Sequence, residues 1–150
     1  MLFSVVVVTY NHENYIYDAL QSIFDQSYRD KFQLVISDDA SNDKTSEIIK
    51  AAISTAPEHI SIIYQRNVHR IGGVRNFNRC IKKAAGEVIV VADGDDCSVP
   101  HRLDVLARSH RNKPRSLYIS NAKEINEFSE SLNKLHFHNK LVFPYSKNLI

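Results

Sequence analysis

Three acidic residues follow directly on an apolar stretch near the middle of the chain. Asp93, Asp95 and Asp96 come immediately after residues 88–92, which are all apolar and mostly β-branched. Carboxylates this close repel one another, and a hard divalent cation with oxygen ligands relieves that repulsion. Gly94 leaves the backbone free to turn and lets a ligand approach closely. The alternative is an ordinary solvated Asp-Gly turn, but the three carboxylates together favour a ligand site.

The apolar residues before these acids predict a strand. Residues 88–93 carry too few polar side chains for a sheet with one solvated face, so we expect this strand to be buried on both faces, as in a parallel sheet. Residues 3–9 and 32–37 have the same character and predict two further strands. The polar side chains that follow these two strands are Thr9, Tyr10, Asp38 and Asp39.

Helical patterns separate the predicted strands. Apolar residues recur at helical spacing within residues 16–24, 48–53 and 74–84. Asn14 and Asp43 are placed to cap the first two of these helices. For the third helix, the apolar face is expected to consist of Val74, Phe77, Ile81 and Ala84, with Gly86 at the C′ position.

This alternation of strands and helices predicts an α/β fold. A short strand at residues 61–65 completes a Rossmann-like, mostly parallel sheet with helices on both faces and right-handed crossovers. Ligands bind beyond the carboxyl ends of the strands in such sheets. The polar residues at the strand ends, Asn67 among them, are therefore expected to meet at one rim.

The remainder of the chain carries a weaker pattern. Pro100 suits the first turn of a helix that ends at Lys113-Pro114, and residues 116–120 predict one more strand. From Asn121 onward we expect a mixture of loop and strand. The 150-residue length fits a single domain spanning residues 1–150.

Composition limits the classes of function. The chain has 43% apolar and 24% charged residues, and its 19 basic and 17 acidic residues give a formal charge of +2. This balance does not suggest a nucleic-acid partner. Cys80 and Cys97 fit no metal-ligand spacing and suit a reducing compartment. Residues 2–8 are too short for a signal-peptide core, so we expect a cytoplasmic protein whose membrane contact, if any, is peripheral at the inner face.

Two common phosphate-binding motifs are missing. No GxGxxG follows the first strand and no GxxxxGK[ST] occurs anywhere in the chain. A divalent cation held by Asp95 would neutralise phosphate in another way. Basic residues cluster at Arg66, Arg70 and Arg75; we expect a solvated basic loop for the first two, whereas for Arg75 contact with phosphate and a solvated side chain remain equally open.

The motifs taken together resemble those of family 2 glycosyltransferases of the GT-A fold. The resemblance is carried by residues 4–11, 34–45, 67–76 and 85–100, in the order and at the spacings of that family. Residues 73–78 resemble the rhamnosyltransferase-like branch, whose members build bacterial surface polysaccharides.

The resemblance implies an inverting transfer of a sugar from a nucleoside diphosphate donor, a UDP-sugar or dTDP-sugar, to a hydroxyl of a saccharide or lipid-linked saccharide. In similar enzymes the segment matching Thr9 and Tyr10 lines the base and ribose pocket. Asp38 or Asp39 would accept the N3–H of the base. Asp93 and Asp95 would form the DxD motif, with Asp93 toward the ribose and Asp95 on Mg²⁺ or Mn²⁺. Alternatives remain at two of these positions. The role of Tyr10 could be limited to packing, and that of Asp39 to capping the turn before the second helix, with Asp38 carrying the base contact.

A catalytic base is the missing part of this assignment. An inverting displacement needs a carboxylate to take the acceptor's proton, and similar enzymes carry it well beyond the DxD motif. The acids that follow Asp104 are Glu124, Glu127 and Glu130. Glu124 is the candidate we retain. We therefore expect an intact donor half without the full acceptor half, and two hypotheses remain: a transferring enzyme, or a truncated or non-catalytic nucleotide-sugar-binding module.

Overall fold

The computed structural model describes residues 1–118, 123–125, 131–135 and 142–144, with side chains for residues 1–118. It divides into two compact units, residues 1–104 and residues 105–150. The first unit contains β1 (Phe3–Thr9), α1 (Ile16–Phe24), β2 (Phe32–Asp38), α2 (Thr45–Ile53), β3 (Ile60–Arg66), α3 (Gly73–Ile81) and β4 (Val88–Asp93). Helix α4 (Arg102–Asn112) begins in the first unit and continues into the second.

The second unit contains four short strands. They are β5 (Ser116–Tyr118), β6 (Lys123–Ile125), β7 (Ser131–Leu135) and β8 (Val142–Pro144). Strand β5 pairs with β8 and β6 pairs with β7, both antiparallel. Strand β5 begins where the sequence predicts a strand, and residues 119 and 120 lie outside the described residues.

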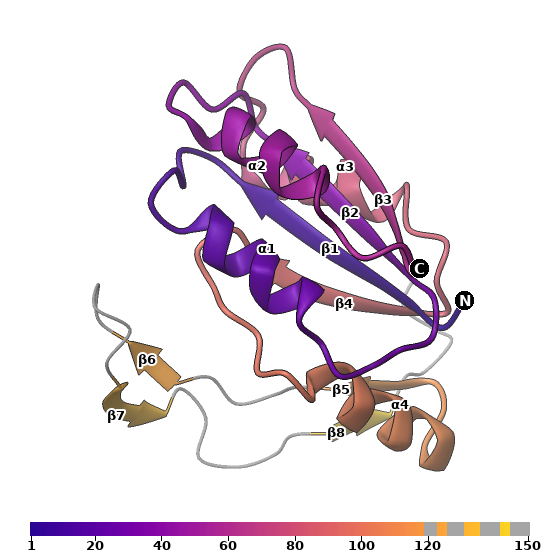
Figure 1. Cartoon of the computed structure of the whole chain (residues 1–150). Coiled ribbons are helices and arrows are strands. Elements are labelled where there is room, and N and C mark those ends of the chain that lie inside the picture. The colour runs from indigo at the N-terminus through magenta and orange to yellow at the C-terminus, as the bar shows by residue number, and fades with distance from the viewer. Residues whose placement is uncertain (119–122, 126–130, 136–141, 145–150) are drawn as a thin grey trace. The chain divides into compact units, whose positions relative to one another are not determined.

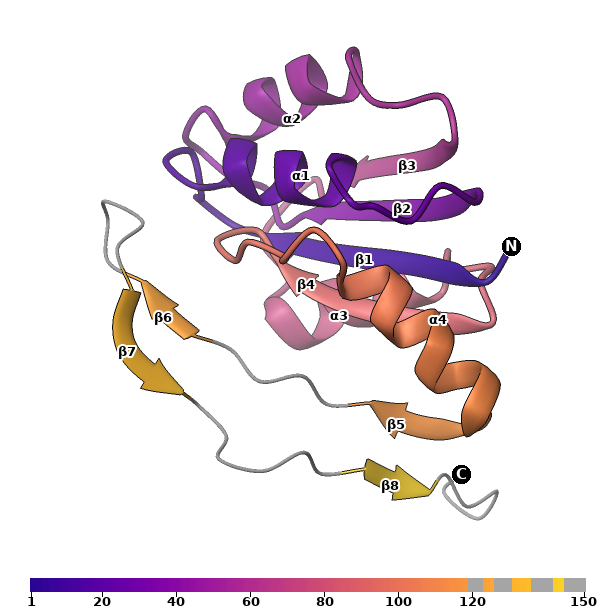
Figure 2. The same cartoon turned by 60° about the horizontal axis from the view of Figure 1, so that its bottom comes forward.

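The first unit is a parallel sheet with strand order β3-β2-β1-β4. Helices α1 and α2 lie on one face of this sheet and α3 lies on the other (Figures 1 and 2). The predicted α/β class, parallel sheet and helices on both faces are confirmed. The register pairs Thr9 with Asp38 and Val8 with Asp93, so the polar ends of three strands lie side by side.

Burial differs between the central strands and β4. Strand β2 is buried at every position, and β1 at all positions but one. In β4, Val90 and Ala92 are buried, whereas Ile89 and Val91 are 40% and 45% exposed. The expected burial of this strand on both faces is therefore wrong. The physical reason is that β4 is an edge strand of the sheet, and α3 packs against β1 and β2.

Helix ends also depart in part from the sequence pattern. Asn14 does not cap α1, since the carbonyl of His12 accepts the N–H groups of Tyr15 and Ile16 at 3.0 and 2.9 Å. Asp43 does act at the start of α2, where its Oδ1 accepts the N–H of Thr45 at 2.9 Å.

The predicted apolar face of helix α3 is confirmed only in part. Phe77 and Ala84 are partly buried against the core, but the fully buried residues of the helix are Asn76 and Cys80, and Val74 is 78% exposed. Cys80 packs with Val6 and Val35 in a buried cluster, and burial raises the pKa of its thiol to about 11. Removal of such side chains from water stabilises the fold by about 1.5–3 kcal/mol for each large apolar residue.

Gly86 has a different role from the expected helix cap. Helix α3 ends at Ile81, well before this glycine. A Cβ at Gly86 would lie 2.4 Å from the backbone nitrogen of Ser4, and the Gly86 N–H donates to Ser4 Oγ at 2.7 Å. The glycine is needed because the chain passes directly against β1 before it enters β4.

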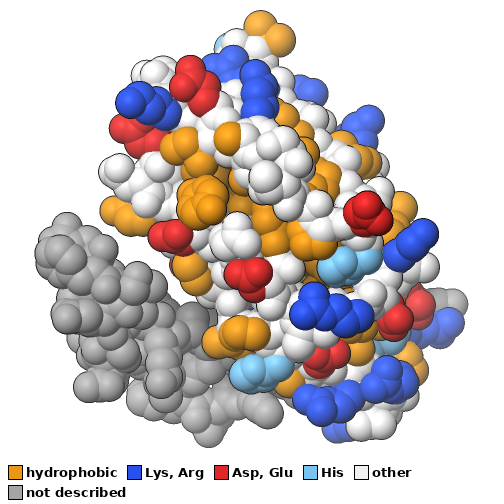
Figure 3. All heavy atoms as spheres, viewed as in Figure 1, with side chains coloured by type: hydrophobic (Ala, Val, Ile, Leu, Met, Phe, Trp, Pro, Cys, Tyr) orange, Lys and Arg blue, Asp and Glu red, His pale blue; other side chains and the backbone are white. Residues whose placement is uncertain are grey.

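Apolar side chains also reach the surface over α1, among scattered acidic groups (Figure 3). The large apolar or aromatic residues exposed in this helix and the turn before it are Tyr15 and Tyr17. Within the described part of the chain, no helix combines the length and apolar character that a membrane crossing requires.

Candidate functional site

The ends of the four parallel strands are tied into one rim by backbone hydrogen bonds. The N–H of Asp39 donates to the carbonyl of Thr9 at 2.9 Å, and the N–H of Asn67 donates to that of Asp38 at 2.8 Å. The N–H of Gly94 donates to the carbonyl of Val8 at 3.0 Å. Thr9, Tyr10, Asp38, Asp39, Asn67, Asp93 and Asp95 therefore lie along the same edge of the sheet.

Asp38 is completely buried and both of its oxygens are bonded. Oδ1 accepts the N–H and the hydroxyl of Ser41, at 2.9 and 2.5 Å. Oδ2 forms an ion pair with Arg66 Nε at 3.2 Å and accepts the hydroxyl of Tyr64 at 3.5 Å. This carboxylate holds the turn after β2 to the end of β3.

Asp39 is also buried, and it binds the loop that leads to α3. Its Oδ1 accepts from Asn67 Nδ2 and from the N–H of Ile71, both at 2.8 Å, and its Oδ2 accepts the N–H of Gly72 at 2.8 Å. Gly72 has a φ of 88°, a backbone conformation that glycine adopts without strain. Each carboxylate oxygen can accept two hydrogen bonds, so Asp39 Oδ2 retains one acceptor position.

The hydrogen bonds of Asp39 determine its acidity. Burial alone would raise the pKa of Asp39, but the hydrogen bonds from Ile71, Asn67 and Gly72 and the charge of Arg70 together hold the pKa below its ordinary value. The residue is therefore a carboxylate anion at neutral pH, in a nearly water-free position.

A second layer of buried amides supports this loop. Asn67 Nδ2 also donates to Asn76 Oδ1 at 2.9 Å, and Asn76 Nδ2 donates to the carbonyl of Ser37 at 2.8 Å. Asn76 is 1% exposed, and the sequence analysis did not identify it. The signal that could have found it is its spacing of four residues from Cys80, which places both on one face of α3.

Two basic residues at the end of β3 and in the loop after it are exposed but have partners at the rim. Arg66 pairs with Asp38 and donates to the carbonyl of Ser41 at 2.6 Å. The guanidinium of Arg70 lies over the ring of Tyr10, 4.1 Å from its centroid, in a cation–π contact. Both arginines are exposed, as expected of a solvated loop, but each also has a partner at a neighbouring strand end that the sequence did not predict. Arg75 is exposed on α3, without a hydrogen bond or ion pair to any described residue.

The acids at the end of β4 have very different surroundings. Asp93, Asp95 and Asp96 are exposed, and no described residue donates a hydrogen bond to their carboxylates. Partial burial and the charges of Asp96 and Asp95 raise the pKa of Asp93, an effect that His12 partly opposes. The repulsion between these carboxylates is therefore relieved only in part by the described residues.

This arrangement suits a divalent cation that is shared with a ligand. The described residues contain no group of three or more His, Cys, Asp or Glu side chains arranged to hold a metal ion. A cation at Asp95 would therefore take its remaining oxygen ligands from water and from a bound phosphate, which is how Mg²⁺ is commonly held. The hard carboxylate oxygens fit Mg²⁺ or Mn²⁺.

Polar atoms without partners lie beside these acids. Thr9 Oγ1 and His12 Nδ1 are buried and form no hydrogen bond with a described residue. A Cβ at Gly94 would lie 2.6 Å from the first atom and 2.8 Å from the second. His12 Nε2 lies 3.9 Å from Asp95 Oδ2. The sequence analysis assigned no role to His12, and its only signal was its position in the turn that follows β1.

The segment after the acids is fixed to α1 and the turn that follows it. Gln26 Nε2 donates to the carbonyl of Val99 at 2.8 Å, and its Oε1 accepts the N–H of Leu103 at 3.1 Å. Arg102 donates to the carbonyl of Val91 at 2.9 Å. These bonds hold the chain on both sides of residues 93–96, so the position of the acids is well defined.

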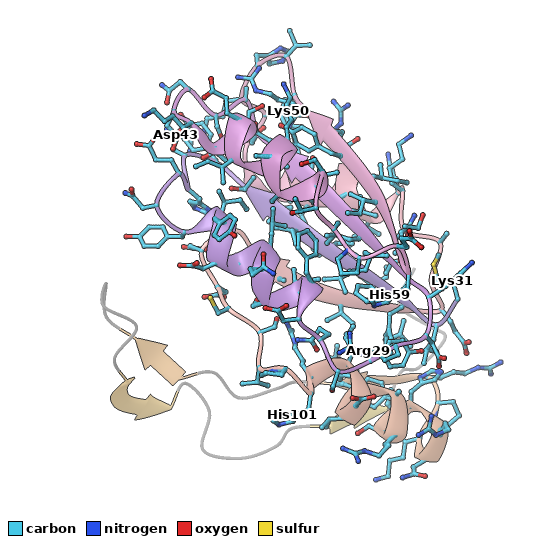
Figure 4. All side chains as sticks on the ribbon, viewed as in Figure 1. Arg29, Lys31, Asp43, Lys50, His59 and His101 are labelled. Carbon is cyan, nitrogen blue, oxygen red and sulfur yellow. The ribbon has the colours of Figure 1, made fainter. Side chains whose placement is uncertain are left out.

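The two rims of the sheet carry different side chains. In Figure 4, Asp43 lies at the end of the sheet where β1 and β2 terminate, whereas His59, Lys31 and Arg29 lie toward the opposite end, where these strands begin. These basic groups and His59 are therefore remote from the acids of the site.

The candidate base cannot be placed at the site. Glu124 lies in β6, and its side chain is outside the described part of the structure. Glu127 and Glu130 lie outside the described residues altogether.

The chain is similar to known proteins in both sequence and fold. Residues 4–149 match the family model described as Glycosyl transferase family 2. The chain is 30% identical over 125 residues to abequosyltransferase RfbV of Salmonella typhimurium, covering 83% of this chain and 37% of that protein. The curated relatives that it matches are much longer, and the chain spans about a third of the first of them.

Two solved structures are similar to the described fold. TarS 1–349 of Staphylococcus aureus in complex with UDP-GlcNAc has a TM-score of 0.73 at 29% identity, covering 81% of this chain and 35% of that one. Mannosyltransferase PcManGT of Pyrobaculum calidifontis, in complex with GDP-Man and Mn²⁺, has a TM-score of 0.70 at 29% identity over the same shares.

Proposed function

Since the chain belongs to glycosyl transferase family 2 and has the GT-A fold, we propose that its rim binds a nucleoside diphosphate sugar for inverting transfer to an acceptor hydroxyl. The observation that carries this proposal is the group of mutually repelling carboxylates at the end of β4, next to the unpartnered atoms of Thr9 and His12. RfbV is named an abequosyltransferase and TarS a poly(ribitol-phosphate) β-N-acetylglucosaminyltransferase, and these sugar-transferring activities support a role in the synthesis of bacterial surface polysaccharides. The rhamnosyltransferase-like branch stays a prediction.

The base of the donor is assigned to the end of β2. Asp39 is the better candidate for accepting the N3–H of uracil or thymine, because its Oδ2 retains an acceptor position while both oxygens of Asp38 are bonded. Tyr10 offers an aromatic face for the base, and Arg70 already lies against that ring. Asn67 supports the pocket by fixing Asp39.

The diphosphate is assigned to the end of β4. Asp95 would hold Mg²⁺ or Mn²⁺, and Asp93 would face the ribose. When bound, the cation supplies positive charge that stabilises the diphosphate as it leaves. The complex of PcManGT with GDP-Man and Mn²⁺ supports this pairing of donor and metal. Arg75 is proposed as a further phosphate contact, since its exposed guanidinium has no other described partner.

The catalytic base and the acceptor complete the assignment. Glu124 remains the proposed base, and a saccharide or lipid-linked saccharide at the inner face of the membrane is the proposed acceptor. The alternative is a donor-binding module without transfer activity, and the transfer assays described below distinguish the two.

Thermal unfolding with nucleotides tests the donor site. UDP or dTDP with Mn²⁺ or Mg²⁺, at a hundredfold excess over the dissociation constant, is expected to stabilise the fold by about 2.7 kcal/mol. Asp95→Ala should remove the metal-dependent part of this stabilisation. An unchanged melting curve of the unaltered chain with every nucleotide and metal would refute the proposal. Transfer assays with a panel of nucleotide sugars, and with Glu124→Gln, then separate enzyme from binding module.

A further inference from the structure

The backbone of His12 is held by hydrogen bonds, whereas its imidazole ring has none with the described residues. Its N–H donates to Thr45 Oγ1 at 2.8 Å, and its carbonyl accepts the first N–H groups of the turn into α1. The backbone of this residue is therefore tied to α2 on one side and to α1 on the other. The ring, by contrast, forms no hydrogen bond with a described residue.

The ring lies between a buried polar pocket and the acids of β4. Nδ1 is buried beside Thr9 Oγ1, and both atoms border the space where a Cβ at Gly94 would stand. Nε2 points to the rim, 3.9 Å from Asp95 Oδ2. That separation is too long for a hydrogen bond. The side chain is 25% exposed, so Nε2 remains accessible to a ligand.

We propose that His12 binds the diphosphate of the donor through Nε2–H, a role that rests on the function proposed above. A neutral imidazole donates from one nitrogen and accepts at the other. Thr9 is 3% exposed and its Oγ1 lacks a partner among the described residues; this atom and His12 Nδ1 lie 2.6 and 2.8 Å from the position of a Cβ at Gly94. In the proposed complex the Thr9 hydroxyl donates to Nδ1. With Nδ1 as acceptor, Nε2 carries the hydrogen and faces the position beside Asp95, where a phosphate oxygen accepts it.

Gly94 belongs to the same site as Thr9 and His12. A side chain at this position would strike both Thr9 and His12, so the glycine allows the strand end, the hydroxyl and the ring to meet. A purely structural histidine would be expected to form an internal hydrogen bond, because buried polar atoms are normally paired. His12 leaves both nitrogens available instead.

Binding of UDP, UMP and uridine by three variants tests this role, with calorimetry in the presence of Mn²⁺. His12→Ala is expected to weaken UDP by about tenfold, the loss typical of one hydrogen bond to a charged group. Uridine, which has no phosphate, should bind within about twofold of the unaltered protein. His12→Gln keeps an N–H donor and should recover part of the affinity. His101→Ala, which removes an exposed histidine from the turn before α4, is the matched control (Figure 4).

Each other outcome has a defined meaning. Equal weakening of UDP and uridine by His12→Ala, or no change in either, would overturn the proposal. So would a loss of Mn²⁺ affinity in the nucleotide-free variant, since that would make His12 a metal ligand. If the unaltered protein itself binds no UDP, the proposed function fails rather than the role of His12 within it.

Discussion

The acids at the end of β2 and the acids at the end of β4 occupy the same rim but have opposite surroundings. Asp38 and Asp39 are buried. Their four oxygens accept hydrogen bonds from residues 41, 64, 67, 71 and 72, and Asp38 also forms an ion pair with Arg66. Asp93 and Asp95 are exposed and receive no hydrogen bond from a described residue. The first pair is bonded within the fold except for one acceptor position on Asp39 Oδ2, whereas the carboxylates of the second pair are open to a ligand.

The pKa shifts express the same difference. Burial would raise the pKa of Asp39, yet its hydrogen bonds and Arg70 lower it. Partial burial and the neighbouring charges of Asp96 and Asp95 raise the pKa of Asp93. Residue type and position on the rim are shared, so the number of donors that the fold supplies decides how much of each carboxylate is left to bind a ligand.

The largest effect is expected on the free energy of unfolding, when the Asp39 carboxylate is removed. Asp39→Ala would leave the N–H groups of Ile71 and Gly72 and the amide of Asn67 without their acceptor, so the free energy of unfolding should fall by about 3–5 kcal/mol. Asp95→Ala should change it by less than about 0.5 kcal/mol in the absence of ligand. Urea denaturation measures both. Similar losses of unfolding free energy in the two variants would show that the hydrogen bonds to Asp39 do not stabilise the fold more than the surroundings of Asp95 do.

A smaller effect is expected on base recognition. Asp39→Asn loses the charge-assisted acceptor and should weaken UDP by about 1–3 kcal/mol while weakening ADP less. Asp38→Asn is the control, because both oxygens of that residue are already bonded, and it should not discriminate between the two nucleotides. Titration calorimetry on variants that remain folded provides the comparison. If Asp38→Asn weakened UDP more than ADP, the contact with the base would be assigned to Asp38 instead.

The smallest effect is expected in the pH dependence of stability. The folded-state pKa of Asp39 is lowered, so its contribution to stability is present above its unfolded pKa, near 3.9, and is lost as the pH falls through the folded value. The folded-state pKa of Asp93 is raised, so its contribution has the opposite sign: it is present below the unfolded pKa and is lost as the pH rises through the folded value.

Denaturation midpoints between pH 3 and pH 7 check these signs against the reference pKa values of carboxyl groups. Asp93→Asn should flatten the fall in stability as the pH rises from about 4. Mn²⁺ with UDP should have the same effect on the unaltered protein, since it compensates the charge. A pH profile that Asp93→Asn leaves unchanged would argue against repulsion among the β4 acids.

The strand and helix order, the placement of acids at strand ends and the family resemblance were all accessible from the sequence. The reason is that hydrophobic periodicity and short motifs are local properties, readable over 5 to 10 residues or so. Buried β1 and β2 follow directly from their β-branched content, and Asp43 at the start of α2 follows from its position. These features require no knowledge of which segments meet in space.

Only the tertiary structure decided how each acid is used. The donors to Asp39 come from Ile71 and Gly72, more than 30 residues away, and strand order brings them to it. Strand β4 is half exposed because it lies at the edge of the sheet, although its residues are as apolar as those of β1. Gly86 and His12 acquire their roles from the backbone and the side chains that pack against them. Hydrogen-bond partners and burial depend on contacts between distant segments, and no local pattern encodes them.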